Sequence, residues 1–261
     1  MSILMGAAAL LAAGVLSAQE VKTFNKAADW NKHPAVTDGE DCLKVSKNVF
    51  LCSPKFQIDP DKTYTLKLSV RAQDIKGKDF SWCLAGFEVF DKDGKSISCD
   101  TVNAVPGTFT TVAADAAKGS SVLMVKDASK FRKGSPYIIV SGAKDDFSDL
   151  PNRKLLARGI DKVEKKDDAW EVTLKGKLVA DAKAGDAIRE HSMGGFLYTA
   201  GGRNVVDKWV TMQGKIKGSS KFGWAGNKWP AGAVSARFII LVNWNNKKLE
   251  TQLKDISMTI E

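Results

Sequence analysis

The sequence has few of the residues on which most enzyme active sites depend. Only two histidines, His33 and His191, occur among 261 residues, and they lie far apart. A histidine-rich metal site or a Ser-His-Asp relay therefore has almost no material. The serines lack a G-x-S-x-G setting, and Glu88, on a predicted strand, has no identifiable second carboxylate for glycoside hydrolysis. The sequence predicts a protein that is not an enzyme.

Long apolar runs are also missing after residue 18, where no stretch approaches the ~20 residues that span a bilayer. Residues 1–18 are apolar or small, carry no charge, and precede the polar pair Gln19 and Glu20. This is the layout of a secretory signal peptide. We expect cleavage near Ala18, with retention as an anchor as the alternative. The mature protein is then secreted or periplasmic, with no membrane contact.

Cysteine is scarce, with four residues in the whole chain. In an exported protein this number favours two disulfides, and each predicted pair brackets one apparent hairpin. The alternatives are four free thiols or a zinc site, and the latter is disfavoured because no C-x2-C spacing occurs. The predicted pairs are Cys42 with Cys52 and Cys83 with Cys99.

Helical periodicity is nearly absent, whereas strand-like alternation is frequent. In residues 64–71, Tyr64, Leu66, Leu68 and Val70 alternate with polar side chains. Many short strands separated by Gly, Asn and Asp turns predict an all-β fold, an antiparallel β-sandwich. Further strands are expected at 80–90, 205–216, 236–244 and 252–260.

The middle of the chain differs in composition from its flanks. Residues 106–194 contain no cysteine and one of the seven tryptophans, Trp170. They have strand patterns of their own, and glycines lie at both ends. We therefore predict a small β-rich subdomain at 106–194, inserted into an outer domain formed by residues 19–105 and 195–261.

The outer domain resembles the jelly-roll, galactose-binding-like carbohydrate-binding modules of secreted bacterial glycoside hydrolases, of the cellulose- and xylan-binding type. The likeness depends on a turn and strand ending in V-R-A, an F-E-V-F-D-K-D-G-K hairpin, a D-K-W-V-T strand and a closing L-K-D-I-S strand. These stretches are residues 59–72, 87–95, 207–211 and 253–257. The resemblance implies a jelly roll that binds carbohydrate.

The same resemblance implies a structural calcium, held by an aspartate of the last strand and an N-terminal acidic residue. Asp255 matches the aspartate. Asn25 stands where the family has an acidic residue, so the ligand set departs from the family pattern at this point.

Carbohydrate binding uses exposed aromatic rings, which stack on the C–H faces of sugars, and polar side chains for the hydroxyls. Trp224 and Trp229 lie in a glycine-punctuated loop, where no strand dictates burial. The alternative is that these rings cap the sandwich. Trp244 shares its parity with apolar neighbours, which favours a core position, and it is kept as a binding candidate. The predicted carbohydrate-binding residues are Arg71, Trp82, Tyr198, Arg203, Trp224, Trp229 and Trp244, with Phe80, Asn243 and Asn245 as further candidates.

Charge narrows the choice of partner. The chain has 39 Lys and Arg against 30 Asp and Glu, a net charge of +9. The basic residues are mainly lysines spread along the sequence, and the expected export argues against a nucleic-acid partner. We predict an exported, non-catalytic protein that binds a polysaccharide or other glycan, and the positive field extends this to acidic polysaccharides. The alternative is a structural or adhesive cell-envelope protein whose sandwich contacts other proteins; the oligomeric state stays open.

Overall fold

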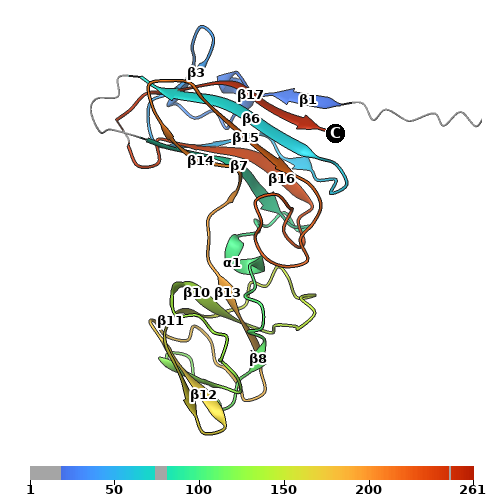
Figure 1. Cartoon of the computed structure of the whole chain (residues 1–261), viewed down its shortest axis with the longest axis vertical. Helices are drawn as coiled ribbons and strands as arrows, with labels where there is room; N and C mark the ends of the chain where they lie inside the picture. Colours follow the sequence, from blue (N-terminus) through green and yellow to red (C-terminus); the bar gives the residue numbers. More distant parts are fainter. Residues whose placement is uncertain (1–18, 74–80, 247) are drawn as a thin grey trace, which may run out of the picture.

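The computed structural model describes residues 19–73, 81–246 and 248–261. The predicted signal peptide and Phe80 lie outside these residues. Two sheets packed face to face form one lobe, and a third sheet forms a second lobe along the long axis of the molecule (Figure 1). The predicted all-β class and antiparallel sandwich are confirmed. No helix among the described residues is long and apolar enough to cross a membrane.

Sheet A is the layer of the sandwich farther from the second lobe (Figure 1). Its strands follow the order β15-β6-β17-β3-β2, and β1 pairs with the other part of β17. All these pairings are antiparallel. The strands are β15 (Val210–Ile216), β6 (Tyr64–Ala72), β17 (Thr251–Ile260), β3 (Leu43–Val45), β2 (Val36–Asp38) and β1 (Glu20–Thr23).

Sheet B is the layer nearer the second lobe, with the strand order β14-β7-β16-β4 and β5 paired to β16. Its pairings are antiparallel as well. The strands are β14 (Leu197–Val205), β7 (Ser81–Phe90), β16 (Ser235–Val242), β4 (Val49–Cys52) and β5 (Phe56–Gln57). A short 3-10 helix, η1 (Ala27–Asp29), precedes β2.

The core of the sandwich follows from alternation along each strand. Tyr64, Leu66, Leu68 and Val70 of β6 face inward and are buried, while the residues between them face outward. On sheet B the inward positions include Phe87, which packs in the same cluster. Because each strand has one apolar face, two sheets bury those faces against each other and leave two outer faces for solvent.

Sheet C forms the second lobe. Its strand order is β8-β13-β10-β11-β12-β9, and it has its own buried apolar cluster. The strands are β8 (Thr110–Thr111), β13 (Ala187–Ser192), β10 (Gly134–Ser141), β11 (Leu155–Lys166), β12 (Ala169–Leu174) and β9 (Val122–Val125). These strands fall within the predicted insert, residues 106–194.

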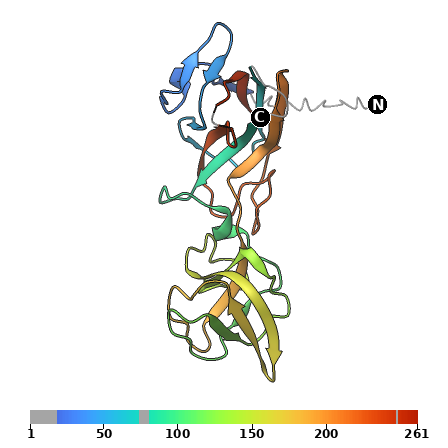
Figure 2. The same ribbon diagram turned by 90° about the vertical axis from the view of Figure 1, so that its left-hand side faces the viewer.

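The junction between the lobes is built around α1 (Cys99–Val102), which follows the hairpin after β7. Figure 2 shows this short helix between the two lobes. The ring of Phe147 stacks on that of Phe222 from the sandwich, with centroids 4.2 Å apart. Arg153 Nη2 lies 2.8 Å from Asp91 Oδ2, which joins the insert to the hairpin by an ion pair. The lobes therefore share aromatic and ionic contacts besides the two chain crossings.

The predicted disulfides are wrong, since all four cysteines are free and buried. Cys42 precedes β3 in sheet A, whereas Cys52 lies on the outer side of sheet B. Ile97, two residues before Cys99, donates its N–H to Val89, six residues along β7 from Cys83. Six residues of strand span about 20 Å, of which two residues recover at most about 7 Å, whereas a disulfide needs Cα atoms within about 7 Å. Bracketing a hairpin in sequence did not bring either pair together.

Trp229 is also placed differently from the prediction, because its side chain is fully buried in the sandwich core. Its ring packs against Phe87, with centroids 4.9 Å apart, and edge-on to Tyr64 at 5.2 Å. The backbone of Ser219 forms a parallel bridge with Trp229, which turns the loop inward. The ring caps the sandwich and is not exposed for stacking.

Replacing Trp229 with alanine should lower the free energy of unfolding by about 3 to 5 kcal/mol, because it leaves a large cavity. Trp229→Phe should cost less, since it keeps most of the ring and removes an indole N–H that has no hydrogen-bond partner among the described residues. Urea unfolding measures both. Phe109→Ala, at an exposed aromatic of the insert, is the control. Equal stability of Trp229→Ala and the parent would refute the core position.

Candidate functional site

The outer face of sheet B is mainly apolar, unlike an ordinary solvated sheet face. Its outward positions on β16 and β4 include Ile239, Leu241, Phe50 and Cys52. These side chains form a small second cluster outside the sandwich core, with Leu84, Phe196 and Tyr198 packed against it. An apolar outer face needs a covering, and part of it comes from the chain itself.

The chain returning from the insert supplies that covering. The Phe196 ring stacks on Phe50 with centroids 5.0 Å apart and planes inclined by 24°. The return passes so close to β7 that a Cβ on Gly86 would lie 2.0 Å from the Leu197 carbonyl oxygen. Gly86 is therefore required by the close approach of two backbones.

Trp82 and Trp244, the tryptophan pair, lie at one end of this face. Their side chains are 39% and 57% exposed, among the most exposed large apolar groups of the described chain. The backbone N–H of Trp244 donates to the backbone carbonyl of Trp82 at 3.2 Å. A Cβ on Gly202 would lie 3.2 Å from the Trp82 ring, so the glycine lets that ring lie on β14. The result is two exposed tryptophans whose backbones lie side by side.

Asn243 holds this end of the sheet together. Its side chain is fully buried, and its backbone has a φ of 56°, a left-handed conformation that asparagine tolerates. Oδ1 accepts from the hydroxyls of Ser81 and Thr251, at 3.0 and 2.6 Å. Nδ2 donates to three carbonyl groups, those of Val45, Lys47 and Leu249.

Two further asparagines, Asn245, which is exposed, and Asn48, which is half-buried, complete the support of the tryptophan pair. Asn245 Oδ1 accepts a hydrogen bond from the backbone N–H of Trp82 at 2.6 Å. Asn48 Nδ2 donates to the carbonyl groups of Asn243 and Trp244. Side-chain amides are thus hydrogen-bonded to the backbone at both tryptophans.

The opposite end of the sheet B outer face is polar. Arg237 donates from Nε to Glu88 Oε2 at 2.7 Å, so the carboxylate considered for catalysis is ion-paired. Beside Arg237 and Cys52 lies a hollow of about 240 Å³, which Trp30 and Asn31 also line. Asn31 Nδ2 donates to the Phe50 carbonyl of β4, and Asn31 Oδ1 accepts from the Cys52 N–H. This end offers polar groups beside the apolar cluster.

The structure brings together only part of the predicted site. Tyr198 lies on the sheet B outer face with the tryptophan pair, and Arg203 is exposed on β14 at the edge of the same sheet. Arg71 lies on the outer face of sheet A, on the other side of the sandwich. Trp224 is half-buried at the junction, where its backbone N–H donates to Asn103 Oδ1. The predicted residues are therefore divided among four places: the outer faces of the two sheets, the junction and the sandwich core.

Other contributors had weak signals in the sequence. Phe50 and Phe196 lie far apart along the chain and meet only because the return crosses the sheet. Gly202 lies in a Gly-Gly pair within a strand, where a glycine often marks close packing. That pair was the one available signal for the placement of the Trp82 ring.

The residues implied for calcium do not form a ligand set. Asp255 Oδ2 is 3.3 Å from the Ser69 hydroxyl, and the Asn25 side-chain oxygen already accepts from the Ile256 N–H. Within residues 19–73, 81–246 and 248–261, no three His, Cys, Asp or Glu side chains are grouped to hold a metal. These donors do not fit a calcium ion.

A buried charged cluster on β13 lies at the junction. Arg189 Nη2 is 2.9 Å from Asp149 Oδ2, and both side chains are buried. Arg189 Nε donates to His191 Nε2 at 3.1 Å, so the neutral imidazole carries its proton on Nδ1, which donates to the Asp100 carbonyl at 2.8 Å. Burial, with the Arg189 charge beside the ring, lowers the pKa of His191 to about 4.

Glu190 points to the other side of β13 and is fully buried. Oε2 accepts from the Arg132 N–H at 2.7 Å, while Oε1 has no partner among the described residues. Burial raises the pKa of Glu190 to about 7, despite the opposing effect of Arg132. With both groups closed off from solvent, the cluster connects the lobes and offers no open site.

Comparisons with protein-family models, with curated proteins and with solved structures found no match to this chain. The class that the structure itself defines is an antiparallel β-sandwich, consistent with a jelly roll, that carries a further β-sheet lobe.

Replacing Asn243 with leucine should destabilise the protein by about 3 kcal/mol or more. The change leaves buried hydroxyl and carbonyl groups without a hydrogen-bond partner and places a branched side chain at positive φ. Urea unfolding gives the difference. Asn204→Leu, at an exposed position of β14, is the matched control and should change stability by less than about 1 kcal/mol. Similar losses in both variants would contradict the role assigned to Asn243.

The β13 cluster predicts two opposed pH dependences. Between pH 4.5 and about 7, folded Glu190 keeps a proton that the unfolded chain has lost, so its contribution to stability falls as pH rises. Between about pH 4 and 6.5, the unfolded chain holds a proton on His191 that the folded state lacks, so that contribution rises with pH. In the parent protein the two changes largely cancel where the windows overlap.

Single variants should separate these effects. Relative to the parent, Glu190→Gln should become more stable from pH 4.5 to 7, and His191→Gln should become less stable from pH 4 to 6.5. Each change is up to about 3 kcal/mol, at about 1.4 kcal/mol per pKa unit. Unfolding free energies measured across this pH range test both. Parallel curves for all three proteins would show that neither pKa is shifted.

Proposed function

We propose that this protein is an exported, non-catalytic carbohydrate-binding protein whose tryptophan pair stacks on sugar rings. The observation that carries the proposal is the exposure of two tryptophans, Trp82 and Trp244, whose backbones are hydrogen-bonded to each other and to side-chain amides. A tryptophan side chain has only two rotatable bonds and loses little conformational entropy on binding, which favours stacking on a flat ligand.

The surroundings of the pair support a sugar ligand. Tyr198 extends the aromatic surface, while Asn204, which lies beside Trp82 in the strand register, and Asn245 offer amide groups near the rings. A sugar has both apolar C–H faces and hydroxyl edges, so it needs this mixture. The Glu88–Arg237 ion pair lies on the same outer face and adds polar groups at its far end.

A double variant, Trp82→Ala with Trp244→Ala, tests the proposal. Stacking contributes roughly 0.5 to 1.5 kcal/mol per ring beyond burial, so binding should weaken about tenfold or more. Titration calorimetry with soluble xylan, β-glucan and mannan, on residues 19–261, gives the affinities. The free energy of unfolding should fall by clearly less than for Trp229→Ala, since both residues are partly exposed whereas Trp229 is fully buried.

Phe109→Ala removes an exposed aromatic from the insert and should leave binding unchanged. Equal affinity of the parent and the double variant would reject the tryptophan pair as the site. Absence of binding to any glycan on an array would reject the carbohydrate function and favour the cell-envelope alternative.

A further inference from the structure

The outer face of sheet A has a chemistry opposite to that of sheet B. Alternation and register place only polar side chains at the central outward positions of β6, β15 and β17. The charged side chains at the outward positions of β3, β6, β15 and β17 are five cations and one acid, Asp255. The cations are Lys44, Lys67, Arg71, Lys215 and Lys254. This imbalance is local to one face.

The cations are distributed along the strands rather than clustered. Cross-strand register places Lys215 beside Thr65, Lys67 beside Gln213, and Lys254 beside Ser69. Each row lies two residues from the next, about 6.6 to 6.8 Å along the strand. Arg71 adds a fourth row, two residues beyond Ser69. A linear polyanion lying along β6 would meet one cation in each row.

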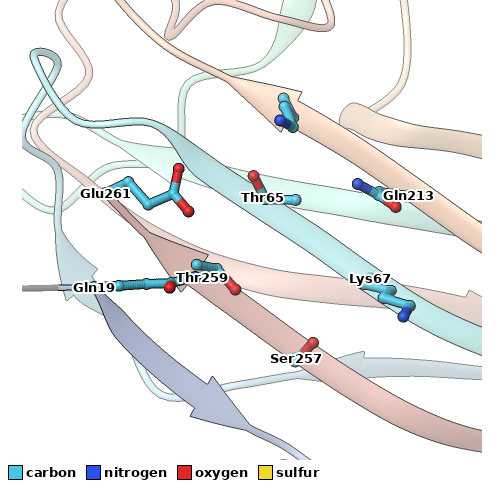
Figure 3. Close-up of a pocket in the computed structure, with 8 residues that line it drawn as sticks. Gln19, Thr65, Lys67, Gln213, Ser257, Thr259 and Glu261 are labelled. Carbon is cyan, nitrogen blue, oxygen red and sulfur yellow. The ribbon is translucent and has the colours of Figure 1, made fainter.

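A hollow of about 310 Å³ lies over the first two rows. Figure 3 shows its lining side chains standing on the same side of neighbouring strands. Lys67 and Lys215 supply the cations, and Glu261 lies at the end of the hollow. The remaining groups are hydroxyls and amides, which both donate and accept hydrogen bonds. They are Gln19, Thr65, Gln213, Ser257 and Thr259.

The fourth row contains an aromatic ring flanked by cations. Arg71 Cζ and Lys254 Nζ each lie 4.6 Å from the centre of the Trp209 ring. Gln252 Oε1 accepts from Arg71 Nε at 2.7 Å, which fixes the guanidinium. A second hollow, of about 460 Å³, lies beside Arg71 and includes Asp207 in its lining. The face thus continues past the first hollow as a polar, cationic track.

We propose that the outer face of sheet A is a second binding surface, which takes an acidic polysaccharide bearing carboxylate or sulfate groups. The choice of a sugar polymer rests on the proposed function; the choice of an anionic one rests on the five cations. Hydroxyls and amides between the cations suit a ligand whose acidic groups are separated by sugar hydroxyls. The tryptophan pair, on the other side of the sandwich, does not take part.

The test compares two variants that lose the same charge. One carries Lys67→Gln, Arg71→Gln, Lys215→Gln and Lys254→Gln on sheet A. The control carries Lys118→Gln, Lys126→Gln, Lys130→Gln and Lys165→Gln, all exposed in the insert. Calorimetric titrations use polygalacturonate, dextran sulfate and uncharged dextran, each at low and high salt.

The sheet A variant should bind both polyanions about tenfold or more weakly, while the control stays within about threefold of the parent. Binding by the parent should weaken as salt rises. Equal losses in both variants would show that net charge alone attracts the polymer and would overturn the proposal. Should the fourfold variant fail to fold, Lys67→Glu alone, at an outward position, repeats the comparison.

A third arm separates this proposal from the proposed function. The tryptophan-pair variant should bind polygalacturonate as the parent does. A loss of binding confined to neutral glycans then identifies the sheet B face, and a loss confined to polyanions identifies the sheet A face. Single-stranded polynucleotide serves as a polyanion without a sugar-acid backbone. Tighter binding of polynucleotide than of both polysaccharides through the same four residues would overturn the assignment of the ligand.

Discussion

The buried Asn243 side chain is the contact on which one whole end of the sandwich depends. It joins Val45 and Thr251 of sheet A to Ser81 of sheet B, so it connects both layers. Two amide hydrogens serve three carbonyl groups, and an apolar side chain could replace none of these bonds. Because Trp244 is the next residue, the asparagine that closes the sandwich also places the Trp244 indole at the surface, with its backbone hydrogen-bonded to that of Trp82.

Alternation along the strands gives the sandwich two outer faces of different chemistry. The outward residues of β6 are Thr65, Lys67, Ser69 and Arg71, whereas β7 presents Trp82, Leu84 and Glu88. A ligand with flat apolar faces suits the second set, and a polar, acidic ligand suits the first. The positive net charge is therefore not spread evenly, because sheet A concentrates cations that sheet B lacks at its centre.

The sequence was sufficient for the fold class and for the inward face of β6, because a period of two is a local property. It was insufficient wherever two distant segments meet. The burial of Trp229 depends on a loop that turns inward onto Phe87, and no local pattern encodes that turn. Parity favoured a core position for Trp244, yet β16 ends at Val242 and the left-handed Asn243 turns the next side chain outward. The cysteine pairs failed for the same reason, since proximity in sequence did not give proximity across strands.

The junction decides how the two proposed surfaces are presented. Phe147 on Phe222, the Arg153–Asp91 ion pair and the His191 bond to Asp100 connect the lobes at separate points. Several contacts of different kinds restrict hinge motion more than a two-strand linker would. The insert consequently stays on the sheet B side of the sandwich (Figure 1). A polymer on the tryptophan pair would extend along a face that borders the insert, whereas one on sheet A would lie on the face turned away from it. Under these two proposals, a long acidic chain would therefore have more room on sheet A, where the cations lie.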